Sequence, residues 1–317
     1  MVNLENLDVI AIGESLVEFS SDIKLSDAEC LHKSYGGDAL AAAVTVQRLG
    51  GHAGFITRVG EDCFKDFLIK NWQDEGLDIS HVRTAPDTNG IYITARPASG
   101  VKEVVYHRKK TASAKLSIDD IEPDYLASTK IVYSSGLTQA LSISAKEAVA
   151  YAFRTAKELG IQTAYDPNFY PDILNVQEAK ENFDEVITNV DIAFMSTRRD
   201  TVDILELDSP EHVIKKLWDF GVGIVVVKSA AEGGYYTGYN GNIAFTEFYI
   251  KDIADTTCTG DVFNGAFLYA ITHSLTPFEA AKLASITAGL QVERLGAIKS
   301  IPRADEVYPI FEKSGEQ

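Results

Sequence analysis

The chain has few of the features that mark secreted, metal-binding or membrane-spanning proteins. Its three cysteines, Cys30, Cys63 and Cys258, are odd in number and widely spaced, which favours neither a disulfide framework nor a zinc site. No apolar run approaches the roughly 18 residues that a membrane-spanning helix needs. The first apolar run, Val9 to Ile12, is too short for the core of a signal peptide. We therefore expect a protein of the reducing cytoplasm.

Positive charge is also scarce. The 317 residues include 29 Lys and Arg against 46 Asp and Glu, for a net charge of −17. This balance argues against nucleic-acid and membrane partners, although it excludes neither a local basic pocket nor an anionic substrate. The six histidines show no metal-ligand spacing. No Gly-x-Gly-x-x-Gly follows the first predicted strand, where Gly13, Glu14 and Ser15 stand instead, which ranks a dinucleotide-dependent oxidoreductase low.

Short β-branched runs alternate with helical patterns along most of the chain. The predicted strands are Asp8–Ile12, Gly54–Val59, Lys130–Tyr133, Gln162–Tyr165, Asp191–Met195 and Gly223–Val227, and the predicted helices are Ala39–Leu49, Phe64–Glu75, Ser144–Leu159, Val176–Val190 and Pro210–Phe220. This order predicts an α/β fold with a doubly wound, mostly parallel sheet. Ligands of such sheets bind beyond the carboxyl ends of the strands. Asp166, Asn168, Ser196 and Lys228 are among the small or polar residues expected there.

One region breaks the alternation. Gly90–Arg96 and Val101–Arg108 alternate around the turn Pro97–Gly100, which predicts a β-hairpin, and Leu16–Ser20 and Leu31–Tyr35 can add strands to it. The resulting small antiparallel sheet, from about 14–37 and 88–112, could be a decorative edge. It could also be a lid that excludes water from a reaction.

A strongly apolar helix follows the segment that begins at Asp255. The residues of its buried stripe are Val262, Phe263, Ala266, Phe267, Ala270 and Ile271, which places the helix start near Gly260. Backbone amides of Cys258, Thr259 and Gly260 would then lie unpaired at the positive end of the helix dipole, where they suit phosphate oxygens.

Two side chains at this helix start each allow two interpretations. Asp261 can simply complement the helix dipole, or it can be a general base beside a bound phosphoryl group. Cys258 can be a packed small residue, or a reactive thiol whose pKa is lowered by the amides.

Several motifs occur in an order and at a spacing that resemble a known family. They are Gly36-Gly37-Asp38, Arg58 to Asp62, Asp166-Pro167-Asn168, Lys228 to Gly234 and Gly260 to Phe267. On these residues the whole chain resembles the ribokinase-like sugar kinases of the phosphofructokinase-B family. Tyr92 and the run from Tyr106 to Ser113 are most similar to 2-keto-3-deoxygluconate kinases.

The resemblance implies a ribokinase-like domain over residues 1–317, ATP and Mg²⁺ as cofactors, and a small sugar or sugar acid as substrate. Asp261 matches the base, and the amides of Cys258, Thr259 and Gly260 match the anion hole. The residues matching the sugar pocket are Gly36, Gly37, Asp38, Tyr92, Tyr106, Arg108 and Asp166, and those matching the nucleotide side are Ser196, Lys228, Ala230, Gly233 and Ser285. The small sheet could also form a homodimer.

The chain departs from the family pattern around this pocket. Cys258 and Thr259 replace the usual Gly-Ala, and Ala41 and Ala230 replace an Asn and a Gly. The family's Asn-x-x-Glu falls on Ser196 to Arg199, and the Arg after Asp-Pro-Asn-x is Tyr170. Because Asp261 is retained, we expect a working kinase, whereas a weakly catalytic regulator that binds a sugar acid or nucleotide is the alternative.

The substrate also stays open at this point. Arg108 suits a substrate carboxylate such as that of 2-keto-3-deoxygluconate, because a guanidinium offers two parallel N–H groups to two oxygens. Arg108 could instead protect a strand edge together with Lys109 and Lys110. A neutral sugar such as fructose or ribose would then be the substrate.

Overall fold

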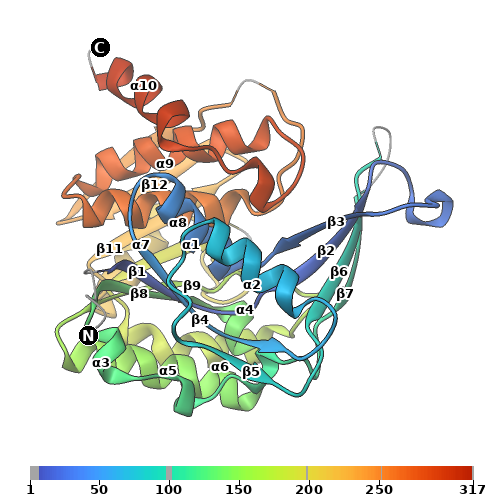
Figure 1. Ribbon diagram of the computed structural model, residues 1–317. Coiled ribbons are helices and arrows are strands. Elements are labelled where there is room, and N and C mark those ends of the chain that lie inside the picture. The colour runs from blue at the N-terminus through green and yellow to red at the C-terminus, as the bar shows by residue number, and fades with distance from the viewer. Residues whose placement is uncertain (1–6, 98–101, 198, 251, 316–317) are drawn as a thin grey trace.

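The computed structural model describes residues 7–97, 102–197, 199–250 and 252–315. A large sheet runs through the molecule, and a small sheet projects from one side of it (Figure 1). The large sheet has nine strands in the order β13-β12-β11-β10-β9-β8-β1-β4-β5. Their bounds are β1 Leu7–Ile12, β4 Ala53–Gly60, β5 Val82–Ala85, β8 Thr129–Ser135, β9 Gln162–Asp166, β10 Ile192–Ser196, β11 Ile224–Ser229, β12 Gly234–Tyr239 and β13 Asn242–Glu247. The strands from β11 to β5 are parallel, and β12 and β13 extend the edge antiparallel.

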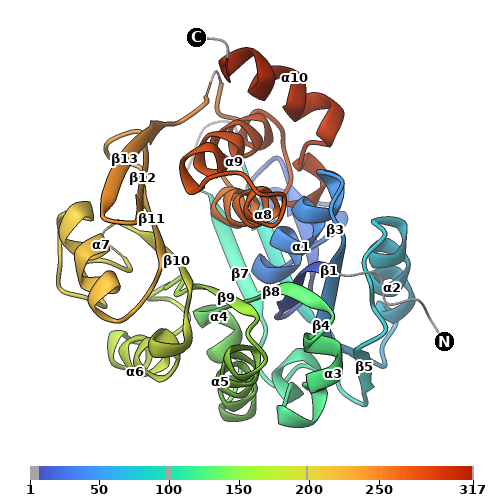
Figure 2. The ribbon, with the colours of Figure 1, turned by 90° about the vertical axis from the view of Figure 1, so that its left-hand side faces the viewer.

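Helices cover both faces of the large sheet (Figure 2). The helices are α1 Asp38–Arg48, α2 Lys65–Asp74, α3 Pro123–Leu126, α4 Gly136–Gln139, α5 Ile143–Glu158, α6 Val176–Val186, α7 Pro210–Asp219, α8 Thr259–Thr272, α9 Pro277–Val292 and α10 Ala304–Gly315. Short 3₁₀ helices are η1 Leu25–Asp27, η2 Ser113–Lys115, η3 Ile118–Asp120, η4 Ile187–Asn189 and η5 Ile298–Ser300.

Alternate residues of β1 belong to two separate cores, because successive side chains of a strand point to opposite faces. Val9 and Ala11 pack in the core with α1, α8 and α9. Ile10 and Ile12 pack in the core with α5, α6 and α7. The predicted doubly wound α/β sheet is therefore confirmed.

The strand and helix predictions from the sequence differ from the structure at a few places. The helix predicted over Val176–Val190 ends at Val186 and continues as the 3₁₀ helix η4. Strands β5, β12 and β13 were not predicted. β5 has four residues, and β13 is largely exposed with no buried position, so neither carries the apolar pattern on which strand prediction depends.

The small sheet contains β2 (Leu16–Ser21), β3 (His32–Gly36), β6 (Gly90–Ala95) and β7 (Glu103–His107) in the order β3-β2-β6-β7. The predicted hairpin β6–β7 and the pair β2–β3 are antiparallel, whereas β2 pairs with β6 in parallel. The predicted turn Pro97–Gly100 and the predicted strand start at Val101 extend outside the described residues. Gly36 is the last residue of β3, and Arg108 directly follows the last residue of β7.

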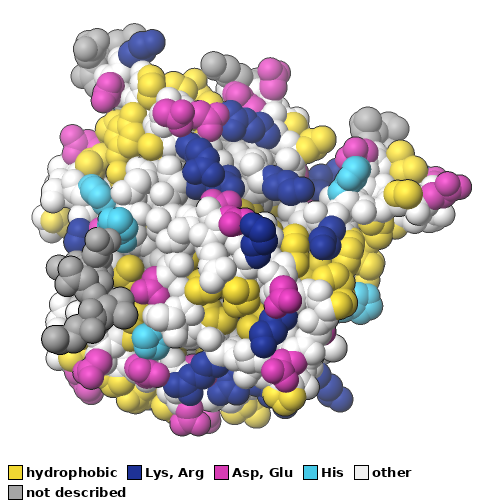
Figure 3. All heavy atoms as spheres, in the orientation of Figure 1, with side chains coloured by type: hydrophobic (Ala, Val, Ile, Leu, Met, Phe, Trp, Pro, Cys, Tyr) yellow, Lys and Arg dark blue, Asp and Glu magenta, His cyan; other side chains and the backbone are white. Residues whose placement is uncertain are grey.

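Charged side chains of both signs are mixed over the face seen in Figure 3, and apolar side chains gather where the small sheet projects. Val104, Val105 and Tyr106 of this sheet are exposed. The suggested homodimer through the sheet stays a prediction. Within the part of the chain that the structure describes, no helix is long and apolar enough to cross a membrane.

Candidate active site

The carboxyl ends of neighbouring strands bring polar side chains together at one edge of the large sheet. In the strand register, Ser135 of β8 lies beside Asp166 of β9, and Ser196 of β10 lies beside Lys228 of β11. Lys228 Nζ lies 2.5 Å from Asp166 Oδ2. The Ser135 hydroxyl donates to the carboxylate of Asp38, the first residue of α1. The structure therefore brings the predicted residues Asp38, Asp166, Ser196 and Lys228 together at this edge.

Helix α8 begins at Thr259, one residue before the predicted start. Cys258 caps it in the left-handed conformation, with φ of 60°. A Cβ atom on Gly260 would lie 3.4 Å from Lys228 Nζ, so the ammonium group lies against the first turn. The Thr259 amide, predicted to be unpaired, donates to the carbonyl oxygen of Thr256 over 3.4 Å. Backbone amides and a cation nevertheless converge at the helix start, which is an arrangement that binds anions.

Asp261 lies in this first turn and is 9% exposed. Asn168 Nδ2 donates to its Oδ1 over 3.1 Å. Burial, followed by the negative charges of Asp38 and Asp166, raises the pKa of Asp261, and Lys228 partly opposes this shift. A carboxylate whose pKa is raised is a stronger base than an ordinary aspartate, because it holds a proton more tightly.

A second row of buried polar side chains, which the sequence did not predict as site residues, supports these groups. Asn264 Nδ2 donates to Asp166 Oδ2 over 2.7 Å and to the Tyr133 hydroxyl over 3.1 Å. Asp200 accepts from the amides of Phe169 and Ser196. Burial and then the charge of Asp166 raise the pKa of Asp200 to about 6. The spacing of Asn264, one turn after Asp261 on the same helix, is the signal that could have identified it.

A side chain at either glycine before α1 would come too close to a neighbouring atom. A Cβ atom on Gly36 would lie 2.7 Å from the Tyr92 hydroxyl. Gly37 has φ of +146°, and a Cβ atom there would lie 2.3 Å from the carbonyl oxygen of Glu14. The glycine pair therefore lets the Tyr92 side chain of β6 and the Glu14 backbone approach the chain just before α1.

Tyr92 and Tyr106 are direct partners across β6 and β7, and their ring centroids are 6.0 Å apart. As direct cross-strand partners, they share one face of the hairpin. Arg108 follows β7 and is buried. Its Nη2 lies 2.6 Å from Glu14 Oε1 and donates to the carbonyl oxygen of Leu137 over 3.1 Å.

Glu14 was not predicted as a substrate-binding residue, yet it already neutralises Arg108. Burial raises the pKa of Glu14 to about 7, and the positive charge of Arg108 partly opposes the shift. The guanidinium is thus held by a carboxylate of the protein itself, a partner that was not predicted from the sequence.

A cavity of about 620 Å³ opens next to Arg108. Its lining is Asp62, Cys63, Phe64, Thr88, Asn89, Ile91, Tyr106, His107, Arg108, Lys109, Thr111, Asp172 and Ile173. The lining includes two predicted sugar-pocket residues but not Asp261. The groups at the start of α8, which lie outside this lining, combine a carboxylate of raised pKa with backbone amides and the Lys228 ammonium.

The remaining predicted residues lie along the β11–β12 end of the sheet. Ala230 and Gly233 lie in the turn between these strands, and Gly233 has φ of +73°. Ser285 is on α9, which packs against β12 and β13. Its hydroxyl donates to the carbonyl of Glu247 and accepts from the amide of Tyr249.

A reactive thiol at Cys258 would need a lowered pKa, whereas the surroundings of Cys258 raise it. Desolvation, followed by the charges of Asp261 and Glu18, raises the pKa of the thiol. The two carboxylates repel a thiolate, which opposes the stabilisation that helix amides would give it.

The pattern of the pfkB family carbohydrate kinases matches residues 6–304. The chain belongs to this family. It is therefore a carbohydrate kinase, a phosphotransferase that acts on a sugar hydroxyl.

Relatives of this carbohydrate kinase cover nearly its full length. It is 29% identical to 2-dehydro-3-deoxygluconokinase of Thermoproteus tenax, over 96% of this chain and 94% of that protein. It is 28% identical to 5-dehydro-2-deoxygluconokinase of Clostridium perfringens (98% and 94% covered) and to fructokinase-1 of Zea mays (96% and 98% covered).

Solved structures share its fold. The structure of 2-dehydro-3-deoxygluconokinase from Thermotoga maritima has a TM-score of 0.86 at 20% identity, with 96% of this chain and 99% of that chain covered. A candidate ribokinase II of E. coli in complex with ATP and Mg²⁺ has a TM-score of 0.88 at 24% identity, with 97% and 99% covered. The ribokinase-like fold is confirmed by these similarities.

Two departures of this carbohydrate kinase from the family pattern are in contact. The Arg199 guanidinium carbon lies 4.3 Å from the centre of the Tyr170 ring, a cation–π contact. By the resemblance described under Sequence analysis, Arg199 replaces a carboxylate and Tyr170 replaces an arginine. Arg198, within the same motif, lies outside the described residues.

Proposed function

We propose that the protein is an ATP-dependent kinase of a 2-keto-3-deoxygluconate-like sugar acid. The observation that carries the proposal is the position of Asp261, a buried carboxylate of raised pKa in the first turn of α8. A base at this place is next to the amides and the Lys228 ammonium that would hold the phosphoryl group. A protein that only bound an anion would gain nothing from a carboxylate there.

In the proposed reaction, Asp261 removes the proton from the substrate hydroxyl as its oxygen forms a bond to the γ-phosphorus of ATP. The bond from that phosphorus to the bridging oxygen breaks, and ADP leaves with the electron pair. The amides of Cys258, Thr259 and Gly260, with Lys228, stabilise charge that develops on the phosphoryl oxygens. Asn168 orients the Asp261 carboxylate through its hydrogen bond.

The donor set fits a magnesium ion that is carried by the nucleotide. Among the described residues, no three His, Cys, Asp or Glu side chains gather as a metal-ligand group. Mg²⁺ is commonly held by phosphates, waters and one or two carboxylates. Bound there, it would neutralise phosphate charge, and the carboxylates of Asp166, Asp200 and Asp261 are close to Lys228.

We propose that the sugar lies between Gly36, Gly37 and Asp38 on one side and Tyr92, Tyr106 and Arg108 of the small sheet on the other. The small sheet would then act as a lid within a single domain of residues 1–317. Asp166 is fully buried, so it would act by holding Lys228 rather than by touching the sugar. Residues proposed to meet the nucleotide are Ser196, Lys228, Ala230, Gly233 and Ser285.

A neutral ketose such as fructose is the second candidate substrate. The ion pair between Arg108 and Glu14 favours it, because a substrate carboxylate would meet a guanidinium that is already neutralised. The pair can also act as a donor and acceptor for sugar hydroxyls. The sugar acid stays ahead because Glu14, whose pKa is about 7, can take up a proton and release Arg108 when a second carboxylate arrives.

The two candidates are separated by an ADP-release screen over sugar acids, hexoses, pentoses and nucleosides, with Mg²⁺ and with Mn²⁺. ADP release that needs 2-keto-3-deoxygluconate supports the primary proposal. Release with fructose or ribose alone supports the neutral sugar, and no release with any sugar would leave a regulator that binds without turnover.

A further inference from the structure

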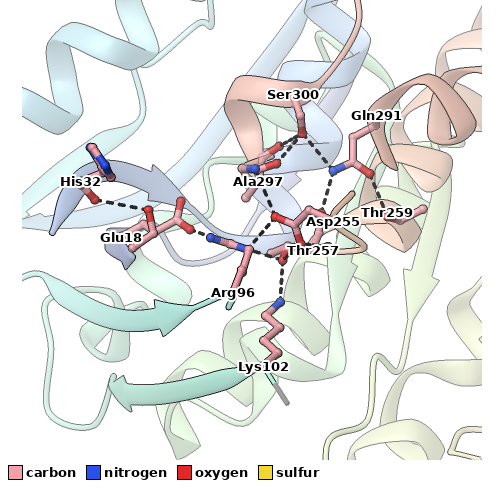
Figure 4. Close-up of polar contacts among 12 residues, drawn as sticks. Glu18, His32, Arg96, Lys102, Asp255, Thr257, Thr259, Gln291, Ala297 and Ser300 are labelled. Atoms are coloured by element: carbon pink, nitrogen blue, oxygen red, sulfur yellow. Dashed lines mark hydrogen bonds and ion pairs between the residues drawn. The ribbon is translucent and has the colours of Figure 1, made fainter. Parts of the chain in front are cut away.

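A polar network joins the small sheet to the segment that leads into α8 (Figure 4). Its centre is Arg96, which directly follows β6 and has a side chain that is 10% exposed. Arg96 Nη2 lies 2.9 Å from Glu18 Oε1 of β2, and its Nε lies 2.6 Å from Asp255 Oδ2. The Nε contact is an ion pair without hydrogen-bond alignment. One guanidinium thus bridges two buried carboxylates, one in the small sheet and one in the main body.

Asp255 shapes the turn that precedes α8. Its Oδ1 accepts from the amide of Thr257 over 3.0 Å and from the Thr257 hydroxyl over 2.5 Å. Its Oδ2 accepts from the amide of Gly296 over 3.1 Å. Arg96 Nη2 and Lys102 Nζ, both from the small-sheet region, also reach the Thr257 hydroxyl, over 3.3 and 2.5 Å. The position of Thr257 therefore depends on Asp255 and on two cations.

Gln291 carries the network into the anion-binding turn. It is fully buried on α9, and its Nε2 donates to the Thr257 carbonyl over 2.9 Å and to the Ser300 hydroxyl over 3.0 Å. Its Oε1 accepts from the Thr259 hydroxyl over 2.8 Å. Thr259 is the first residue of α8 and one of the residues whose amides are proposed to hold the phosphoryl group.

We propose that Arg96 is a positioning residue that fixes the phosphoryl-binding turn relative to the small sheet. Tyr92 and Tyr106, which are proposed to face the sugar, lie on the same small sheet as Glu18. The bridge through Arg96 would therefore hold the sugar side and the phosphoryl side of the reaction in one alignment. This inference rests on the proposed function, because it assigns the turn at residues 257–260 to phosphoryl binding.

The chain offers a control for the loss of an arginine that pairs with a buried carboxylate. Arg58 pairs with the buried Asp120 over 2.8 Å and joins β4 to η3, so it does not touch the segment before α8. Arg96→Met removes the guanidinium partner of Glu18 and Asp255, and Arg58→Met leaves Asp120 with the longer 3.5 Å contact to Arg83. Both changes remove a cation from a buried carboxylate and should lower the melting temperature. Only Arg96→Met should act on the phosphoryl-binding turn.

Two measurements on the full-length protein decide the proposal. Hydrogen exchange followed by mass spectrometry should show faster exchange in a peptide covering 255–262 in Arg96→Met, and no change there in Arg58→Met. In the ADP-release assay, kcat of Arg96→Met should fall by about 10- to 100-fold, because an error near 1 Å in the placement of reacting groups costs about that much. Arg96→Lys should recover part of the loss, since an ammonium can meet one of the two carboxylates.

A double variant tests whether the effect travels through the network. The losses of kcat in Arg96→Met and Gln291→Leu should be less than additive when the two changes are combined, because both loosen the same turn. Independent, additive losses would contradict a shared route. If Arg96→Met does not fold, Arg96→Lys is measured in its place and decides in the same way.

Equal kcat and equal exchange in Arg96→Met and Arg58→Met would overturn the proposal and leave Arg96 as a structural ion pair. Unchanged kcat in Arg96→Met would overturn it even if exchange rose. A wild-type protein that releases no ADP with any sugar would instead remove the proposed function, and the exchange of the 255–262 peptide would then decide about Arg96 alone.

Discussion

Replacement of Asp261 by asparagine separates catalysis from structure, because it keeps the shape and removes the base. Asn168 can still donate to the Oδ1 of residue 261, since an amide oxygen accepts as a carboxylate oxygen does. A positioned general base contributes about 10²- to 10⁴-fold to rate. The raised pKa of Asp261 makes it a better base than an ordinary aspartate, so we expect kcat of Asp261→Asn to fall by at least about 10²-fold.

The same substitution should stabilise the protein. Burial and the charges of Asp38 and Asp166 disfavour the ionised form of Asp261, so a neutral amide relieves that repulsion at neutral pH. We therefore expect a higher melting temperature together with the lower turnover. Such an exchange of stability for activity is common where an active site is electrostatically strained.

Asp8→Asn is the matched control. Asp8 is also buried, but it lies on β1 and pairs with Lys130 over 2.8 Å. Its loss should lower the melting temperature and leave kcat unchanged. The assay is coupled ADP release at saturating ATP and sugar, with ATP affinity measured by calorimetry. Unchanged turnover in Asp261→Asn would remove Asp261 from the mechanism.

Three further predictions follow from the site. Arg108→Ala should raise KM for 2-keto-3-deoxygluconate by about ten- to a hundredfold, from the loss of a charge-assisted hydrogen bond of about 1.5 to 3 kcal/mol, and leave KM for fructose nearly unchanged; similar effects on both sugars would contradict the carboxylate role. Glu14 has a pKa of about 7 in the folded protein against an ordinary 4.5. Its contribution to the free energy of unfolding should be fully present below pH 4.5, and roughly 3 kcal/mol of that contribution should be lost as pH rises from 4.5 through 7. Urea unfolding should show this pH dependence weakened in Glu14→Gln, and an unchanged dependence would refute the assignment. Cys258 should alkylate more slowly than the exposed Cys30 and Cys63, and faster labelling of Cys258 that ATP blocks would show a reactive thiol instead.

Local patterns in the sequence predicted which strand ends and which helix start lie at the site. The βαβ alternation placed Asp166, Ser196 and Lys228 at one edge, because the carboxyl ends of parallel strands must meet there. The apolar stripe of α8 located its start to within one residue. These features depend on periods of two and of 3.6 residues, which a single sequence displays.

Contacts between distant segments could not be predicted in the same way. The ion pairs Glu14–Arg108 and Arg96–Asp255 join residues far apart in the chain, and no local pattern specifies their partners. The two interpretations of Cys258 could not be separated for the same reason: the helix start is visible in the sequence, whereas the neighbouring carboxylate of Glu18, which helps to raise the pKa of the thiol, is not.

Steady-state kinetics of the wild-type protein with ATP, Mg²⁺ and either 2-keto-3-deoxygluconate or fructose test the central claim most directly. The account predicts a higher kcat/KM for the sugar acid, with one ADP released for each sugar acid that gains a phosphoryl group, as followed by mass spectrometry. A higher kcat/KM for fructose, or ADP release without a phosphorylated sugar acid, would contradict it.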